Sequence, residues 1–386
     1  MNSNKRIQSI DLLRGTVIVI MALDHVRDYF HGAAFLFDPT DLSKTDGAMF
    51  FTRWITHFCA PVFTFLAGTS AFLSGVHKTK KQLSSFLLTR GLWLVFAEIF
   101  IITFGWLFNP AFPVFILQVI WALGISMMVL AALVWLPSPV ILAIGLILIA
   151  GHNILDYVPG SSDIYNIMHR QAPLSIGPAD FFIGYPLLPW IGIMCTGYTF
   201  GQLYLPSYDA ARRKQWLITL GLGAVLLFII IRFINGYGDP QPWSQQSTPF
   251  FTFLSFLNTT KYPPSLLYTL MTLGPALLFL AFTEKPVNTF TQKLVVLGRV
   301  PMFFYIIHIY FIHLLGVAAM VISGHPWHDM VLHTWVTANE QLMGYGYPLW
   351  VVYVLWIVIM IALYPLCRRY DAYKKANRQK WWLSYV

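Results

Sequence analysis

Long apolar runs alternate with short polar stretches along the whole chain. About ten of these runs approach the roughly 20 residues that a helix needs to cross a bilayer. They lie at about 12–31, 52–76, 86–108, 113–136, 138–157, 180–204, 215–235, 263–283, 294–322 and 347–367. The pattern predicts an all-α integral membrane protein, a bundle of about ten transmembrane helices that forms a single domain over residues 1–386.

The composition excludes a soluble globule. Hydrophobic residues make up 57% of the chain and charged residues only 11%, whereas soluble domains are about one quarter charged. So little polar surface cannot cover a water-facing protein, and lipid must solvate the remainder. We therefore expect a multi-pass protein of a bacterial-type cytoplasmic (inner) membrane, with membrane lipids as its surroundings.

Basic residues concentrate in alternate loops, and this asymmetry orients the predicted bundle. If the N-terminus is cytoplasmic, an even number of crossings returns the C-terminus to the same side. The cytoplasmic loops and tail then contain Lys78, Lys80, Lys81, Arg212, Arg213, Lys214, Lys285, Lys293 and the cations between Arg368 and Lys380. The opposite loops carry few cations, chiefly Lys44 and Arg170. The positive-inside rule therefore predicts that both termini are cytoplasmic.

Neither nucleic acid nor metal is an expected partner. The net charge of +9 suits an anionic inner leaflet, and the chain contains no nucleic-acid-binding motif. Cys59, Cys195 and Cys367 lie far apart, so they indicate neither a disulfide framework nor a zinc site. The histidines near His325 and His328 are too loosely spaced to predict a metal site.

Two segments are irregular enough to shape a site. Gly184, Pro186 and Pro189 favour a kinked or broken sixth helix beside a cavity. The external segment 236–262 mixes turn residues with aromatic residues. It lies on the membrane, folds over a site as a lid, or is an ordered connector packed on the bundle.

The first predicted helix carries the densest group of ionisable residues. A charge inside a span costs about 2.5–3.5 kcal/mol even on the gentler scales, so such residues are usually functional or paired. At about 100° per residue, Asp11, Arg14, His25 and Asp28 fall on one stripe. Arg14 lies near the cytoplasmic end and His25 about 16 Å deeper. We expect this stripe to face a polar cavity.

The residue types on this stripe suit a transfer reaction. An arginine near the cytoplasm can hold an anionic donor, and a histidine beside a carboxylate can take a proton from an acceptor. Asp24 or Asp28 could orient the ring of His25. The alternative is structural: Asp11–Arg14 as a helix-start pair, and Asp24 and Asp28 with Arg27 as an interfacial ion cluster.

Three patches together resemble a known family. They are 9–15 (SIDLLRG), 61–70 (PVFTFLAGTS) and 298–308 (GRVPMFFYIIH). Their order and spacing are similar to the transmembrane acyltransferases, and within them to the heparan-α-glucosaminide N-acetyltransferase catalytic-domain family and its bacterial relatives. The ten residues between Arg14 and His25 also resemble the spacing of acyltransferase-3 relatives.

The resemblance implies acyl transfer from a cytosolic acyl-CoA to an acceptor at the outer face, with a histidine as general base. The chain departs from the family at that position. Lysosomal members have Asn where this chain has His25, and their histidine comes later, where this chain has His31. They also have an acidic residue near the position of His57. The base is therefore His25, His31 or His57.

Other polar residues have candidate roles in binding the two substrates. Arg53 and Lys261 lie at external helix ends and either bind an anionic acceptor or cap and snorkel at the interface. For acyl-CoA, the candidates are Asp11, Arg14, Arg90, Arg299, Tyr305 and His308. Arg90 and Arg299 suit the CoA phosphates or serve the positive-inside rule. His308 and Tyr305 match the family pattern and would position the thioester, or pack on a neighbouring helix.

The sequence thus predicts an acyl-CoA-dependent O- or N-acyltransferase, with acetyl-CoA as the expected donor and a sugar or glycan as the acceptor. A secondary transporter would also use intramembrane carboxylates and histidines, but it favours inverted repeats, which the hydrophobic pattern lacks. A non-catalytic scaffold does not need a buried charged stripe. Whether the protein forms a homodimer stays open.

Overall fold

A computed structural model describes residues 7–285 and 287–385, and this part of the chain is mostly helical. The first half contains α1 Gln8–Phe30, α2 Gly47–Thr56, α3 Cys59–Gly75, α4 Lys80–Phe96, α5 Thr103–Leu107, α6 Val119–Leu133, α7 Ser138–Gly151 and α8 Asp163–His169. The second half contains α9 Leu187–Phe200, α10 Ala210–Ile234, α11 Pro249–Leu257, α12 Leu266–Thr283, α13 Thr289–Arg299, α14 Pro301–Ile322 and α15 Leu349–Ala376. Each of the ten predicted runs overlaps at least one of these helices.

Among the described residues, seven helical segments are long and apolar enough to cross a membrane. They are Gly47–Gly75, Lys80–Leu107, Ser138–Tyr157, Ala210–Ile234, Leu266–Thr283, Pro301–Ile322 and Leu349–Ala376. α6 and α9, with 15 and 14 residues, are shorter than a full span, and α1 carries charges. The protein is a multi-pass membrane protein, while the count of about ten spans stays a prediction.

Polar N-caps explain where several of these helices begin. The side chains of Asp46, Thr79, Asp209 and Ser265 each accept a hydrogen bond from a backbone N–H in the first turn. These bonds satisfy N–H groups that have no partner inside the helix. The caps therefore start α2, α4, α10 and α12 at defined residues.

The prediction of an all-α protein is wrong in one respect, because the chain also forms a small sheet in the order β1-β3-β2. β1 Phe115–Leu117 pairs in parallel with β3 Ala179–Ile183, and β2 Ala172–Ile176 pairs with β3 in antiparallel fashion. The predicted runs at 113–136 and 180–204 each begin in one of these strands, where Phe and Ile favour extended backbone. Because these strands and the helices that follow them are both hydrophobic, the pattern of hydrophobic residues did not reveal where strand changes to helix.

Prolines mark the starts of α9 and α14. Pro186 is the N-cap of α9 and Pro189 lies in its first turn, so the predicted run 180–204 is broken near Pro186 into β3 and α9. Likewise, the predicted run 294–322 is two helices, because Pro301 occupies the first turn of α14 and α13 ends at Arg299.

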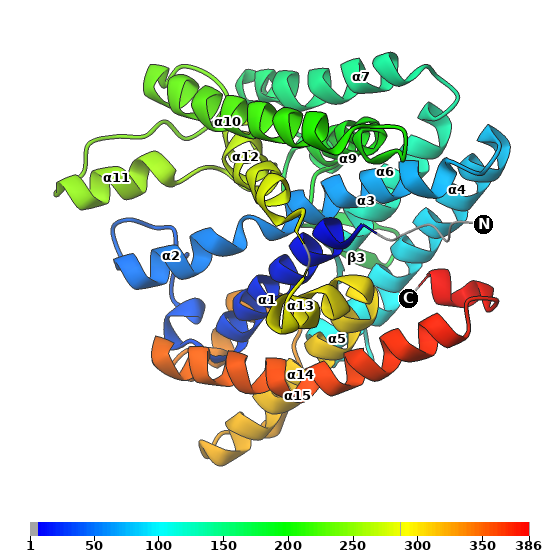
Figure 1. The fold of residues 1–386 in the computed structure, drawn as a ribbon. Coiled ribbons are helices and arrows are strands. Elements are labelled where there is room, and N and C mark those ends of the chain that lie inside the picture. The colour runs from blue at the N-terminus through cyan, green and yellow to red at the C-terminus, as the bar shows by residue number, and fades with distance from the viewer. Residues whose placement is uncertain (1–6, 286, 386) are drawn as a thin grey trace.

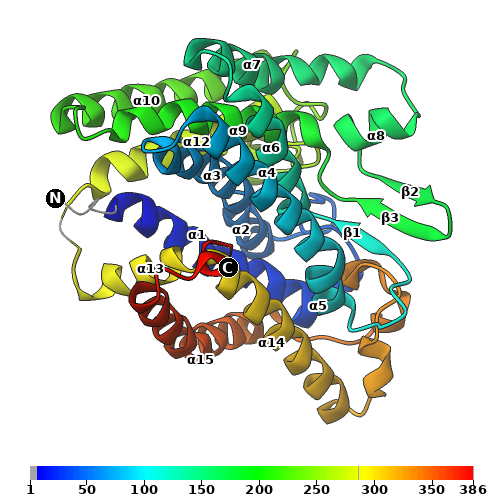
Figure 2. The same ribbon diagram turned by 90° about the vertical axis from the view of Figure 1, so that its right-hand side faces the viewer.

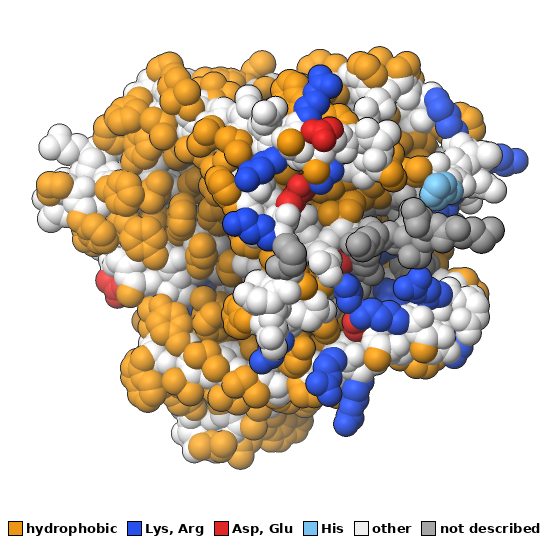
Figure 3. Space-filling view, in the orientation of Figure 1, with side chains coloured by type: hydrophobic (Ala, Val, Ile, Leu, Met, Phe, Trp, Pro, Cys, Tyr) orange, Lys and Arg blue, Asp and Glu red, His pale blue; other side chains and the backbone are white. Residues whose placement is uncertain are grey.

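α1 lies at the centre of the bundle, in contact with α2, α3, α12, α13, α14 and α15. Figure 1 shows the start of α1 and the end of α15 on the same side of the molecule, and Figure 2 shows α13 and α15 beside α1 in a second view. Lys and Arg side chains gather over the centre and right of the face in Figure 3, toward that same side, whereas hydrophobic side chains cover most of its left half. The cytoplasmic assignment of this side stays a prediction.

Two glycines allow α1 and α13 to cross in direct contact. A Cβ atom on Gly15 would lie 1.9 Å from the carbonyl oxygen of Leu294, and one on Gly298 would lie 1.9 Å from the carbonyl oxygen of Asp11. Both obstacles are backbone atoms, which cannot rotate away. The glycines therefore set how closely α13 approaches the charged helix.

We expect Gly298→Ala to destabilise the protein by about 3 kcal/mol or more, because α1 and α13 must separate to admit the methyl group. Thermal unfolding in detergent measures the change. Gly223→Ala is the matched control, since a Cβ atom on Gly223 meets nothing within 4 Å. Equal melting temperatures for the two variants would contradict the crossing described here.

Candidate functional site

A cavity of about 470 Å³ lies against the C-terminal half of α1. Charged and histidine side chains on its wall are Asp24, His25, Arg27, Asp28, Asp38, Arg53 and Lys261. Aromatic and amide side chains complete the wall, among them Phe37, Gln118, Gln171, Phe182, Tyr185, Tyr262, Tyr305 and Trp335. Residues from α1, α2, the 31–46 loop, the sheet and the loop before α12 thus meet around one space.

The ring of His25 is held on three sides. Its Nδ1 lies 2.7 Å from Nε2 of His308 on α14, and the two ring planes are inclined by 20° with centroids 5.0 Å apart, so the rings meet edge to edge. Trp106 and Tyr305 pack edge-on against His25, with ring centroids at 4.9 Å and 6.1 Å. His308 in turn contacts the carbonyl oxygen of Phe304 through Nδ1, at 2.9 Å. The imidazole of His25 therefore has a fixed orientation on the cavity wall.

The carboxylates of α1 have arginine partners. Asp24 lies 2.5 Å from a guanidinium nitrogen of Arg53 and 2.9 Å from one of Arg27, and Asp28 lies 2.6 Å from Arg27. Within the described chain, no hydrogen bond joins His25 to either carboxylate. The expectation that Asp24 or Asp28 orients the ring is therefore not met in this structure, where His308 takes that place. The contacts match the alternative of a buried ion cluster.

Lys261 reaches the cavity from a well-anchored loop. Only 9% of the residue is exposed, and its ammonium lies 5.0 Å from the centre of the Tyr262 ring. Burial raises the pKa of Tyr262, but the nearby Lys261 and Arg53 cations outweigh burial and leave that pKa below its ordinary value. The Tyr262 hydroxyl therefore lies in a positive electrostatic environment.

Asp239 holds the loop that contains Lys261 in place. Its carboxylate accepts hydrogen bonds from the backbone N–H of Thr260 at 2.8 Å and from the Ser265 hydroxyl at 2.6 Å. Burial nonetheless raises the pKa of Asp239. The last residues of segment 236–262 are therefore held in place beside the cavity.

The two alternative bases are not among the residues that line this cavity. His31 is the residue after α1, buried beside Tyr347, with which it forms an isolated bridge, and burial lowers its pKa. His57 packs on the ring of Tyr268 at a centroid distance of 5.3 Å, and its carbonyl accepts a hydrogen bond from the Tyr268 hydroxyl. Among the three candidates, all within the described chain, His25 alone lines the cavity.

Asp11, Arg14 and Arg299, three of the six predicted donor-binding residues, form a second polar cluster near the start of α1, whereas Tyr305 and His308 lie beside His25. Arg14 donates to Asp11 at 3.2 Å, to the Gly298 carbonyl at 3.1 Å and to the Ser70 hydroxyl at 2.9 Å. Arg299 lies 3.5 Å from Asp11 as well. Arg90 lies on α4, with its guanidinium 5.9 Å from the centre of the Phe86 ring.

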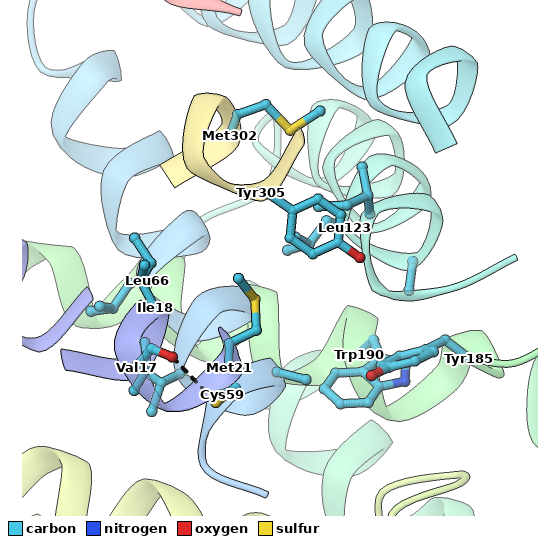
Figure 4. Close-up of a cluster of buried hydrophobic side chains, with 14 of the residues drawn as sticks. Val17, Ile18, Met21, Cys59, Leu66, Leu123, Tyr185, Trp190, Met302 and Tyr305 are labelled. Carbon is cyan, nitrogen blue, oxygen red and sulfur yellow. Dashed lines mark hydrogen bonds between the residues drawn. The ribbon is translucent and has the colours of Figure 1, made fainter. Parts of the chain in front are cut away.

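An apolar layer separates the two polar clusters. Figure 4 shows Val17, Ile18, Met21, Cys59 and Leu66 packed together between α1 and α3, with Cys59 donating to the Val17 carbonyl at 3.3 Å. Ile18 is fully buried. The polar stripe expected along α1 is therefore interrupted in this structure, and the cavity reaches only its C-terminal part.

Several residues that line the cavity were not identified as site residues from the sequence. Gln118, Tyr262 and Trp335 line the cavity from three segments far apart in the chain. Only Tyr262 had a signal, because it adjoins Lys261. The contact of His308 with His25 could not be found from spacing along either helix.

A comparison of the sequence with models of protein families found a match. The model described as heparan-alpha-glucosaminide N-acetyltransferase, catalytic, matches residues 6–232, which is more than half of the chain. The match covers α1, with Arg14, Asp24 and His25, whereas Lys261 and His308 lie beyond it. A search of curated proteins found no match.

Proposed function

Because the chain belongs to the heparan-alpha-glucosaminide N-acetyltransferase catalytic family, we propose that it transfers an acetyl group from cytosolic acetyl-CoA to a sugar or glycan acceptor at the outer face. Family membership implies an acyltransferase of the membrane. The finer proposal depends mainly on one observation: the ring of His25 is fixed on the wall of a 470 Å³ cavity, and neither of the two other candidate bases is among the residues that line it.

The proposed reaction is a direct transfer with His25 as general base. His25 takes the proton of an acceptor hydroxyl or amine, and the acceptor oxygen or nitrogen bonds to the thioester carbonyl carbon. The carbon–sulfur bond breaks, and the leaving CoA thiolate takes the proton back from His25. The products are the acetylated acceptor and free CoA, so atoms and charge balance. The buried thiol of Cys59, which donates to the Val17 carbonyl, needs no part in this sequence.

The acceptor and the donor would approach His25 from opposite sides. Gln118 and Gln171 beside aromatic rings such as Trp335 suit a sugar, because amides pair with hydroxyl groups and rings pack on its apolar faces. The donor phosphates would lie near Arg14 and Arg299. The acyl-bearing arm of the donor must then pass the apolar layer around Ile18, which requires those side chains to move apart.

Incubation of the purified protein with radiolabelled acetyl-CoA and a panel of amino sugars and oligosaccharides tests this proposal. We expect CoA to be released only when an acceptor is present, in equal amount with acetylated product identified by mass spectrometry. Binding of acetyl-CoA is measured separately with the same label. If the wild-type protein binds no acetyl-CoA, the proposal fails and a secondary transporter becomes the better interpretation.

A further inference from the structure

The hydrogen bonds around His308 determine which ring nitrogens carry protons. The Phe304 carbonyl oxygen can only accept, so Nδ1 of His308, 2.9 Å away, must be the donor. In a neutral imidazole the other nitrogen is then unprotonated, so Nε2 of His308 accepts. Its partner at 2.7 Å, Nδ1 of His25, must therefore carry the proton. Nε2 of His25 is left as an unprotonated nitrogen.

We propose that His308 is a positioning residue that fixes the tautomer of His25, so that Nε2 of His25 is the basic atom. This inference rests on the proposed function for its catalytic meaning. It assigns a different role from the one expected from the sequence, in which His308 positions the thioester. His308 is fully buried and is not among the residues that line the cavity. Both of its nitrogens are already engaged.

The arrangement performs the orienting task of a catalytic triad without a carboxylate. A general base needs one nitrogen free and the other held by an acceptor, which keeps the ring in place. When His25 takes a proton at Nε2, its Nδ1 proton can move to Nε2 of His308, because that atom already accepts the hydrogen bond. The positive charge is then shared between two hydrogen-bonded rings, while Asp24 and Asp28 stay with Arg27.

Two substitutions of His308 separate its two hydrogen bonds. His308→Gln offers a carbonyl oxygen near the position of Nε2, so it can still accept from His25. His308→Asn can still donate to the Phe304 carbonyl but is too short to reach His25. We expect kcat to fall about 100-fold in His308→Asn with KM for acetyl-CoA nearly unchanged, and His308→Gln to recover about tenfold of that loss. A donor-binding role would instead raise KM.

The tautomer itself is measured by nitrogen NMR on protein labelled at its histidines, with the His25 signals assigned from their loss in His25→Gln. We expect a protonated Nδ1 and an unprotonated Nε2 in the wild type, and a mixture of tautomers in His308→Asn. A wild-type His25 protonated at Nε2 overturns the inference whatever the activity. The expected tautomer in a protein that transfers no acetyl group overturns the proposed function alone.

Discussion

Replacement of His25 by alanine is expected to lower kcat for acetyl transfer by about 10²–10⁴-fold, while the protein still binds acetyl-CoA. General-base catalysis contributes a factor of this size. Among the described residues that line the cavity, His25 is the only histidine, so no other imidazole there can replace it as the base. The predicted donor cluster at Arg14 lies across the apolar layer and is not touched by the substitution. Product formation and binding of labelled acetyl-CoA, measured on the same preparation, give the two quantities.

Three further alanine variants make this result specific. His77 lies beyond the end of α3, away from the cavity, and His77→Ala should retain the wild-type rate. His31→Ala and His57→Ala should lower kcat far less than His25→Ala, because neither ring lines the cavity. If His31→Ala or His57→Ala abolishes transfer while His25→Ala does not, the base has been assigned to the wrong histidine.

The sequence correctly predicted the features that depend on a single helix. The stripe of Asp11, Arg14, His25 and Asp28 follows from helical geometry, and all four residues lie on α1 in the structure. Hydrophobic runs located the helices by their length. Both inferences need only the properties of a single helix.

The contacts between helices could not be predicted in this way. His25 and His308 are 283 residues apart, and nothing in either helix identifies the other as its partner. The pairing of Asp24 with Arg53 depends on how α2 packs against α1. A regular stripe also could not reveal that Ile18 and Leu66 close the space between its two polar ends. These features depend on tertiary packing, which spacing along one helix does not encode.

Buried carboxylates can hold the cavity wall together without acting on the substrate, and Asp24 is the clearest example. Asp24→Asn keeps the shape of the side chain but removes the negative charge that contacts both Arg27 and Arg53. Arg27 retains Asp28, whereas the ion pair of Arg53 is lost. Loss of one partner of a buried pair typically costs about 3–5 kcal/mol. We expect a destabilisation of that size.

Thermal unfolding can be followed with a thiol-reactive dye, because Cys59, Cys195 and Cys367 are all free and buried. Asp41→Asn is the matched control: its partner Lys44 is 3.7 Å away and exposed, so stability should change by less than about 0.5 kcal/mol. The double variant Asp24→Asn with Arg53→Gln removes both charges of the pair. It should be more stable than the sum of the single effects predicts, because no guanidinium is then left unpaired at this position. Strict additivity would show that the ion pair does not hold α2 against α1.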